Sequence, residues 1–424
     1  MLQNPLMSLV SRIAGDITRA EGKKFLRLCE EIDDSLITPE NLVKGSGISL
    51  YIHIPFCRAL CPFCCFNRYL FKEDKARNYF RSLKKELDLY VRRGFTFSHF
   101  YFGGGTPTIL MDELVDFIAY LKSSFAVKEI SLETTPNEIN PETLALLKNS
   151  GVNRLSIGVQ SFNDDVSKAM GRVLCSGEEA KEKLLQAQGQ FETLNIDLIF
   201  NFPFQSINTF KSDVETFKNL GIDQVTFYPL MPSPHKKNTM ERKFRHVDNS
   251  FENKYYEIIL SEIYDKGYKP STVWCFSRGD RMIDEYIVNY SDYIGIGSGS
   301  VSLVRGNFYV NAFSLENYEA LLQQDRFPIV RWRKLSEREY LRYYLLTKLF
   351  GMSIDTCEFS RDFDADMRKK LAFELFLLKT GGVIHEQSNL FKVTRQGMYP
   401  VSVMMREFFA ALNTLREYCI ENRI

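Results

Sequence analysis

Four of the chain's nine cysteines lie within nine residues, in the stretch YIHIPFCRALCPFCCFN that spans 51–67. Cys57, Cys61 and Cys64 are spaced C-x3-C-x2-C, and Cys65 follows Cys64 directly. The group comes just after a run of bulky apolar residues that is typical of a buried strand. Thiolates in a short loop after a strand can hold a metal ion or an iron–sulfur cluster. Three thiolates on a four-iron cluster would leave one iron open for a further ligand.

Zinc binding, redox exchange and simple packing account for these cysteines less well. A structural zinc site usually takes four ligands from two separated pairs, but there is no second C-x2-C and the five histidines are dispersed. Cys61 and Cys64 have the spacing of a two-electron redox pair, which leaves Cys57 without a role. Cysteines packed only as small apolar residues are the remaining alternative. The spacing therefore favours a cluster site.

The elements that must position this loop alternate between two patterns. Short β-rich runs occur at 48–54, 97–103, 129–134, 154–160, 195–202 and 224–230. Stretches with helical spacing lie between them, for example at 76–94 and 111–125. Strands alternating with helices predict a parallel sheet with crossover helices, and this number of units favours an α/β fold with a partial (β/α)6-type parallel barrel. Reactive groups are then expected at the C-terminal ends of the strands.

Two further regions flank the alternating part. Residues 1–47 indicate a helical segment that ends in a polar linker, LVKGSG. After about residue 330 the pattern predicts a helix, two short strands around a turn and a long amphipathic helix, which is the outline of a winged-helix unit. We therefore expect an N-terminal helical segment (1–47), a partial barrel (48–330) and a small C-terminal winged-helix-like α/β domain (331–424).

The composition narrows the class of protein. Hydrophobic residues make up 45% and charged residues 25% of the 424-residue chain, which is ordinary for a soluble globular protein. The net charge of +1 gives no overall attraction to nucleic acid or to an anionic membrane. No apolar run approaches the length of a membrane span, and we recognise no signal peptide. The odd number of cysteines, most of them scattered outside the cluster, suits a reducing cytoplasm, where we expect the protein to act.

A glycine-rich loop and three strand-end residues are the other candidates for chemistry. The GGGTP motif at 103–107 follows an expected strand, and glycines allow a backbone to approach a ligand closely. A plain tight turn is the alternative for this motif. Glu133, Gln160 and Asp197 fall at or near the ends of three strands, where polar side chains can converge on a ligand. Solvated strand ends are the alternative for any one of them.

Taken together, these motifs resemble those of one enzyme family. The C-x3-C-x2-C spacing resembles the cluster motif of the radical S-adenosylmethionine (SAM) superfamily. The segments YIHIPFC, FYFGGGTPT, RLSIGVQSF and NIDLIFNFP are similar to its HemN-like branch, which contains the oxygen-independent coproporphyrinogen III oxidases. The resemblance covers about residues 48–310, with a weaker match to the C-terminal domain of that branch.

The resemblance implies a set of cofactors. Cys57, Cys61 and Cys64 would ligate a 4Fe–4S cluster, and a first SAM would chelate the open iron through its amino and carboxylate groups. One-electron cleavage of this SAM gives a 5′-deoxyadenosyl radical, and an electron donor such as flavodoxin or ferredoxin is implied as a partner. The protein positions these cofactors and keeps water away from them. The resemblance implies no ligand role for Cys65, and we assign no catalytic side chain.

Residue-by-residue matches to the family place two SAM molecules. The positions that match residues around the first SAM are Tyr51, Gly104, Glu133 and Val301. The positions that match residues around the second SAM are Phe63, Gly105, Thr106, Gln160, Arg172, Asp197 and, with a looser spacing, Pro229.

Members of this branch carry out several reactions. The segments TFYPLMPS and PSTVWCFSRGD are similar to a methyltransferase class in which the second SAM is the carbon donor to an sp2 carbon. We therefore expect C-methylation, or methylene transfer, to a flat apolar substrate such as a quinone or a tetrapyrrole. The alternatives are coproporphyrinogen III oxidation, anaerobic haem degradation with methyl transfer, and a non-catalytic haem chaperone.

Two departures bear on those alternatives. The oxidase has a further cysteine in a C-x-C step, where this chain has Phe66. The chaperone family carries an H-N-x-x-Y-W segment, and the comparable RGNFYVN at 305–311 lacks its histidine and tryptophan. Both departures count against these two alternatives.

The last helix of the sequence has one apolar side. Its members are Met404, Phe408, Ala411, Leu412, Leu415 and Cys419. Such a stripe is most often part of a core, and a cover over a flat apolar substrate is the functional alternative. The winged-helix outline alone suggests DNA binding, but the neutral charge and the lack of a basic recognition helix argue against a nucleic-acid partner.

Overall fold

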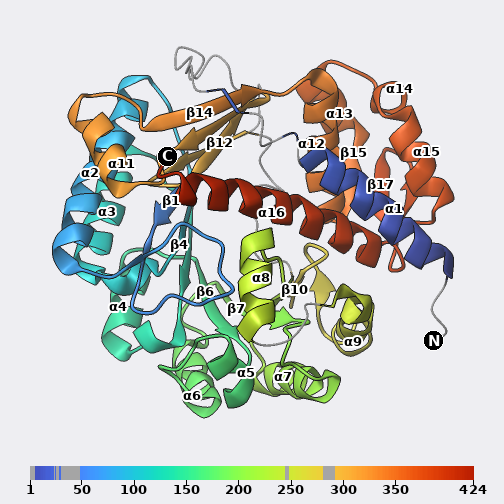
Figure 1. Cartoon of the computed structure of the whole chain (residues 1–424), viewed down its shortest axis with the longest axis horizontal. Coiled ribbons are helices and arrows are strands. Elements are labelled where there is room, and N and C mark those ends of the chain that lie inside the picture. Colours follow the sequence, from blue (N-terminus) through green and yellow to red (C-terminus); the bar gives the residue numbers. More distant parts are fainter. Residues whose placement is uncertain (1–4, 23, 25–27, 30–47, 244–247, 280–291) are drawn as a thin grey trace.

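The computed structural model describes residues 5–22, 24, 28–29, 48–243, 248–279 and 292–424. A twelve-stranded mixed sheet forms its centre (Figure 1). Its middle strands are parallel and follow one another in chain order: β1 (Ser49–Ile54), β4 (His99–Gly104), β5 (Glu129–Thr134), β6 (Arg154–Gln160), β7 (Thr193–Phe200) and β8 (Gln224–Pro229). Since the strand order never reverses, the sheet is a partial barrel and not a doubly wound sheet. The predicted fold class is confirmed.

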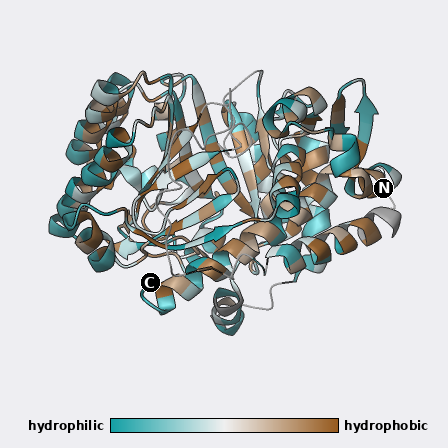
Figure 2. Ribbon diagram, turned by 90° about the horizontal axis from the view of Figure 1, so that it is seen from above, coloured by the Kyte–Doolittle hydropathy of each residue, from teal (hydrophilic) through white to brown (hydrophobic). Residues whose placement is uncertain are grey.

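Helices connect these strands on the outside of the sheet (Figure 1). They are α2 (Glu73–Arg92), α3 (Met111–Ser124), α4 (Pro141–Asn149), α5 (Asp164–Ala169), α6 (Gly177–Ala187) and α7 (Ile207–Leu220), followed after β8 by α8 (Pro234–Lys243) and α9 (Glu252–Glu262). Every residue of β6 is buried, as expected for a parallel strand that is covered on both faces. Figure 2 shows hydrophobic residues along the central strands and hydrophilic residues on the outer helices.

Short strands extend the sheet at both edges. Next to β1 lies the parallel β11 (Tyr293–Ile296), followed by the antiparallel β12 (Val301–Val304), β13 (Asn307–Asn311) and β14 (Ile329–Lys334), with α11 (Leu315–Gln323) between the last two. β10 (Cys275–Ser277) lies beside β8 and runs antiparallel to it, and β9 (Lys269–Pro270) lies beside β10 and runs antiparallel to that strand. The sequence pattern did not predict these edge strands. β14 crosses the boundary expected at 330, and the expected domain limits stay predictions.

The C-terminal part contains the expected elements, with further short ones between them. These are α12 (Glu337–Phe350), β15 (Ser353–Asp355), α13 (Thr356–Phe363), α14 (Met367–Lys370), α15 (Ala372–Thr380), β16 (Ile384–Gln387), β17 (Leu390–Val393) and α16 (Met398–Glu421). The two short strands and the long last helix are as predicted, and β15 adds an unpredicted third strand that pairs with β17. Its three residues follow a helix too closely to give a periodic signal.

The N-terminal helix α1 (Pro5–Gly22) packs along α16 (Figure 1). Gly15 and Gly22 allow the close approach, because a Cβ at Gly22 would lie 2.5 Å from that of Ala411. The helix expected within 1–47 is therefore present, and the expected linker at 42–47 lies outside the described residues. None of the helices described is both long and apolar enough to cross a membrane.

Candidate active site

A pocket of about 390 Å³ lies at the C-terminal ends of the parallel strands. It is lined by every residue that the sequence analysis proposed for the cluster and the two SAM molecules: Tyr51, Cys57, Cys61, Phe63, Cys64, Gly104, Gly105, Thr106, Glu133, Gln160, Arg172, Asp197, Pro229 and Val301. These residues come from segments far apart in the chain, and the fold brings them to one place. Their individual roles stay predictions.

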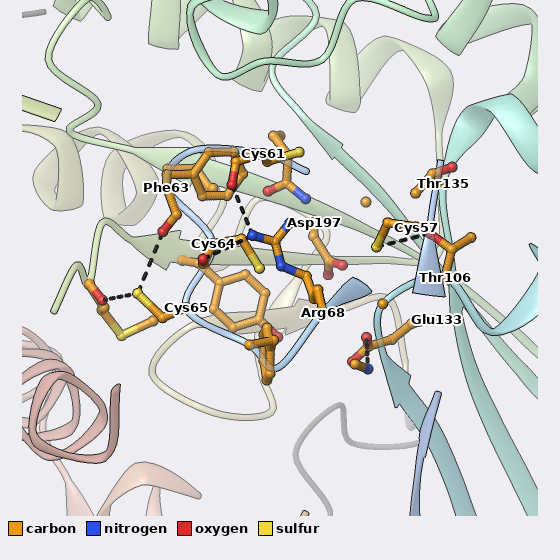
Figure 3. A pocket seen from close by; sticks show the side chains of 18 of the residues that line it. Cys57, Cys61, Phe63, Cys64, Cys65, Arg68, Thr106, Glu133, Thr135 and Asp197 are labelled. Atoms are coloured by element: carbon orange, nitrogen blue, oxygen red, sulfur yellow. Dashed lines mark hydrogen bonds between the residues drawn. The ribbon is translucent and has the colours of Figure 1, made fainter. Parts of the chain in front are cut away.

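The cysteine loop is closed at its base by two short parallel strands, β2 (Phe56–Cys57) and β3 (Tyr69–Leu70). Within the loop, the amide of Cys64 donates to the carbonyl of Cys61 at 3.3 Å. The guanidinium of Arg68 donates to the carbonyls of Cys61 and Cys64 at 3.0 and 3.1 Å (Figure 3). Arg68 therefore fixes the turn that presents two of the three thiols.

The donor set fits a 4Fe–4S cluster. Burial raises the pKa of Cys57, and the positive charge of Arg68 acts in the opposite direction. A guanidinium beside several thiols favours the thiolate form that iron requires. The Arg68 Nε atom is buried and has no hydrogen-bond partner in the described residues. No three Cys, His, Asp or Glu side chains among those residues could share one metal ion, whereas a cluster binds each thiolate through its own iron.

The glycine-rich loop is fastened to the strand that leads to Cys57. The amides of Gly105 and Thr106 donate to the carbonyls of Ile54 and Phe56, both at 2.8 Å. The Thr106 hydroxyl lies 3.8 Å from the Cys57 sulfur (Figure 3). The loop is therefore part of the pocket wall, and its position depends on a close backbone approach at Gly105.

Replacing Gly105 with alanine should disturb this approach. A Cβ there would lie 2.6 Å from the Phe56 carbonyl oxygen and 2.8 Å from that of Ile54, and backbone atoms cannot move aside as a flexible side chain can. We expect the free energy of unfolding to fall by about 1–3 kcal/mol, and SAM cleavage to fall because Phe56 precedes Cys57. Denaturant unfolding and 5′-deoxyadenosine formation measure the two effects.

The matched control is Gly189→Ala. Gly189 has a glycine-favouring φ of 72°, but a Cβ there meets no atom within 4 Å. The substitution should cost only the local backbone strain and leave SAM cleavage at the parental level. Equal losses of SAM cleavage in both variants would contradict a specific role of the loop.

Glu133 lies beneath the glycine-rich loop. Its carboxylate accepts from the Tyr101 hydroxyl at 2.8 Å and from the Gly104 amide at 3.3 Å. A Cβ at Gly103 would meet this carboxylate at 3.0 Å. The glycines thus leave room for a charged acceptor at the end of β5, and an ammonium group is the ligand that such an acceptor suits.

Tyr51 reaches the pocket from β1 and is held by His53. Burial lowers the pKa of His53 to about 4, so its ring is neutral. Its Nε2 faces the Asn67 carbonyl at 2.9 Å and must carry the proton, so Nδ1 accepts from the Tyr51 hydroxyl at 2.9 Å. The Tyr51 hydroxyl is therefore the donor in this contact. Asn67 donates in turn to Ser298 and Phe313, which ties the end of the cysteine loop to the strands near β12.

A second polar group lies at the end of β6 and within β7. Gln160 has a φ of 71°, in a region that non-glycine residues rarely adopt, at a register shift between β6 and β7. Arg172 donates to the Gly158 carbonyl at 2.6 Å, and its buried Nε atom has no partner in the described residues. Asp197 accepts from Asn195 at 2.8 Å and from Ser156. These side chains suit a charged, polar ligand such as the amino-acid part of SAM.

Phe63, Pro229 and Val301 complete the set of matched positions. Phe63 packs edge-on against Phe202 at the far end of the cysteine loop. Pro229 ends β8 and Val301 begins β12, and both line the pocket. Their contribution is apolar surface next to the polar groups.

Comparisons with known proteins agree with this site. The family model described as the radical SAM superfamily matches residues 51–217, which include the cysteine loop, the glycine-rich loop and the strand-end residues. Residues 51–217 therefore form a radical SAM domain. Radical SAM proteins use a 4Fe–4S cluster and SAM, and these are the cofactors of this one.

The relatives of this radical SAM protein belong to the HemN-like branch. It is 28% identical to the oxygen-independent coproporphyrinogen III oxidase of Helicobacter pylori over 413 residues, and this alignment covers 90% of each chain. It is 28% identical over 370 residues to the heme chaperone HemW of Bacillus subtilis, which covers 82% of this chain and 96% of that one. The structure of HemN, the coproporphyrinogen III oxidase of Escherichia coli, shares its fold with a TM-score of 0.76 at 23% identity, over 90% of this chain and 95% of HemN.

The structure adds pocket residues that the sequence analysis of this radical SAM protein missed. Among them are Arg58, Arg68, Trp274, Tyr293, Phe308, Tyr343, Asn413 and Arg416. Arg58 lies inside the cysteine motif, directly after Cys57, and Arg68 follows the last ligand cysteine, Cys64, by only four residues. The other residues stand at no recognisable spacing from the motifs.

Proposed function

We propose that this radical SAM protein binds two SAM molecules and transfers a methyl-derived carbon to an sp2 carbon of a flat, largely apolar substrate. The observation that carries the proposal is one continuous pocket with three kinds of wall. The cysteine loop forms one wall, and Gln160, Arg172 and Asp197 form a polar one. The third wall is apolar and comes mainly from the C-terminal part.

The apolar wall consists of large side chains from four elements or their ends: Trp274, Phe308, Tyr343, Phe408 and Leu412. The Trp274 indole nitrogen donates to the Ser402 hydroxyl at 2.8 Å, which fixes the ring. Rigid aromatic surfaces of this kind suit a flat ring system. Of the stripe on α16, Phe408, Ala411 and Leu412 line the pocket, while Leu415 and Cys419 are buried in a core cluster. One part of the stripe therefore belongs to a core, and the part that lines the pocket would cover a flat substrate.

The charge of the pocket supports a substrate with few negative charges. Four arginines line it (58, 68, 172 and 416), together with three carboxylates (133, 138 and 197), and none of the described lining residues is a lysine. Arg58 is already paired with Glu138 at 2.7 Å. A tetrapyrrole with four propionates would therefore find few uncommitted cations.

The residues of the chain would bind and orient the two SAM molecules and the substrate, and they would exclude water from the pocket. When bound, the cluster and the first SAM supply a 5′-deoxyadenosyl radical, with an electron from a donor such as flavodoxin or ferredoxin. The Tyr51 oxygen and the Glu133 carboxylate would accept hydrogen bonds from the ammonium group of the first SAM. Arg172 would donate to the carboxylate of the second SAM. The apolar wall keeps water from a reactive site.

Oxidation of a coproporphyrinogen-type tetrapyrrole is the second candidate. The names of the relatives support it, since the Helicobacter pylori oxidase matches along 90% of both chains. A role as a haem chaperone has similar support from the Bacillus subtilis protein. Phe66, in place of the oxidase's further cysteine, supports the first candidate.

The balance of products distinguishes these candidates. With a quinone or tetrapyrrole substrate and a reductant, carbon transfer from the second SAM should give 5′-deoxyadenosine and S-adenosylhomocysteine in comparable amounts. One SAM is consumed for the radical and the other loses its methyl carbon. With methyl-deuterated SAM, deuterium should appear in 5′-deoxyadenosine. Chromatography with mass spectrometry measures both products.

Other outcomes point elsewhere. Decarboxylation of coproporphyrinogen III with unlabelled 5′-deoxyadenosine and no S-adenosylhomocysteine would replace the first candidate by the oxidase. Neither product above background, with haem bound, would support the chaperone. Variants of Gln160 or Asp197 that retain full S-adenosylhomocysteine formation would contradict the placement of the second SAM.

A further inference from the structure

Arg416 enters the pocket from α16, which runs across the C-terminal side of the sheet (Figure 1). Phe408, Leu412 and Arg416 follow one another at four-residue steps and therefore share a face of the helix. Asn413 fixes this face in place, because its side-chain amide donates to the Met231 carbonyl at 2.7 Å, just after β8. Arg416 donates to the Asn413 side-chain oxygen at 2.9 Å. The guanidinium is thus held at the pocket end of a well-anchored turn.

The opposite contact of Arg416 is with the cysteine loop. Its guanidinium carbon lies 4.6 Å from the centre of the Phe66 ring, within the range of a cation–π interaction. Phe66 stands where the oxidase has a further cysteine, so this contact depends on a residue in which the chain departs from that enzyme. A ring that supports the face of a guanidinium leaves the N–H groups at its edge available as donors.

The four arginines of the pocket differ in whether their guanidinium groups already have protein partners. Arg58 has a carboxylate partner, and Arg68 donates to two main-chain carbonyls. Arg172 donates to the Gly158 carbonyl beside the second polar group. Among the residues the structure describes, Arg416 makes one hydrogen bond, to a neutral amide, and no ion pair. Since a guanidinium has five N–H donors, most of those of Arg416 lack a protein acceptor there.

The charge of Arg416 also acts on the opposite walls of the pocket. Burial raises the pKa of Tyr51 on β1, and Arg416 opposes that rise. Burial raises the pKa of Tyr293 on β11 to about 12, and Arg416 opposes that rise too. An uncommitted cation in a partly buried pocket is costly unless it meets an acceptor. The apolar wall on its own helix shows where a ring that carries such an acceptor would lie.

We infer that Arg416, supported by Phe66, is a specificity-determining residue that binds an sp2 oxygen of the substrate. The ring system would then lie against Phe408 and Leu412, with the oxygen directed toward Arg416. The inference rests on the proposed function for its choice of a flat substrate. The oxygen can belong to a ring carbonyl or to a carboxylate, and both accept hydrogen bonds from the edge of a guanidinium.

The test measures binding and needs no turnover. The chain has two tryptophans, Trp274 in the pocket and Trp332 outside its lining, so Trp332→Phe leaves one reporter inside. Quenching of that reporter is titrated with two probes, menadione for the carbonyl and coproporphyrin III for the carboxylate. In this background, Arg416→Gln should raise the dissociation constant of at least one probe by about 10- to 100-fold, as expected for the loss of a charged hydrogen bond.

Conservative and matched variants separate binding from folding. Arg416→Lys keeps the charge but not the planar fork, so it should restore part of the affinity for coproporphyrin III and less for menadione. Phe66→Leu should weaken binding in the parent and add little to Arg416→Gln, because the two residues act as a unit. Arg423→Gln makes the same change just beyond the end of the same helix, outside the pocket lining, and should leave both affinities unchanged. Thermal unfolding checks that each variant is folded. If Arg416→Gln does not fold, the affinities of Arg416→Lys and Phe66→Leu test the inference in its place.

Each outcome has one meaning. Loss of affinity for menadione alone assigns the oxygen to a carbonyl, and loss for coproporphyrin III alone assigns it to a carboxylate. A parent protein that binds neither probe overturns the inference. So does an Arg416 variant that binds both as tightly as the parent. Failure of the proposed function is seen separately, in the balance between 5′-deoxyadenosine and S-adenosylhomocysteine.

Discussion

Replacing Cys57, Cys61 or Cys64 with alanine should leave the protein without its cluster and reduce SAM cleavage to background. A three-cysteine site has no spare ligand, and each missing thiolate exposes an iron in a pocket that opens to solvent. The three residues line one pocket, and Arg68 fixes the turn that carries two of them. Iron and sulfide content, the Mössbauer spectrum and the yield of 5′-deoxyadenosine after anaerobic reconstitution measure the loss.

Cys65 provides the matched control, since it lies next to Cys64 in the same loop. Its sulfur lies 3.6 Å from the carbonyl oxygen of Phe63 and 3.9 Å from that of Met231, so it is directed toward the backbone (Figure 3). Cys65→Ala should therefore keep the full iron content. Loss of the cluster in Cys65→Ala together with its retention in Cys64→Ala would show that the ligand assignment is wrong.

The parallel part of the fold could be predicted because its signals are local. The six strands β1 and β4 to β8 are each a short β-rich run, and stretches with helical periodicity lie between them. The edge strands have no such signal: β9 and β10 have two and three residues, and β12 to β14 depend on pairing with one another. Whether a segment of this length forms a strand depends on its pairing with distant strands, and a short window of sequence carries no information about that pairing.

The residues of the candidate site likewise fall into those that the sequence predicts and those that it does not. The cysteines, the GGGTP loop and Glu133 stand at recognisable spacings beside predicted strands, so their convergence could be expected from the sequence. Arg416 is distant in sequence from Phe66, and their contact exists only because α16 crosses the sheet. The neutral state of His53 likewise follows from complete burial, which no spacing reveals. Residues that hold and orient a site through long-range contacts were those that the sequence could not supply.

Replacing Arg406 with methionine should destabilise the same helix that forms the apolar wall. The Arg406 guanidinium donates to Glu252 on α9 at 2.5 Å and to Glu407 at 2.8 Å. Glu252 is fully buried, so the variant would keep a carboxylate in the interior without its counter-charge. We expect the free energy of unfolding to fall by about 3–5 kcal/mol. Urea unfolding of the whole chain at several pH values measures this loss.

The pH dependence of the loss follows from Glu252. Burial raises the pKa of this carboxyl and Arg406 opposes the rise, so removing Arg406 raises the pKa further. A carboxyl whose pKa is higher in the folded state binds its proton more tightly there, so it stabilises at low pH and loses that contribution as the pH rises. The Arg406→Met defect should therefore be smaller in mildly acid than in alkaline buffer, and Glu252→Gln in the same chain should relieve much of it.

Arg19→Met removes the exposed end of the same network, where Arg19 pairs with Glu407 at 2.6 Å, and should cost less than about 1 kcal/mol. A defect in Arg406→Met that is equal at all pH values, or that matches Arg19→Met, would show that the buried charge is not its cause.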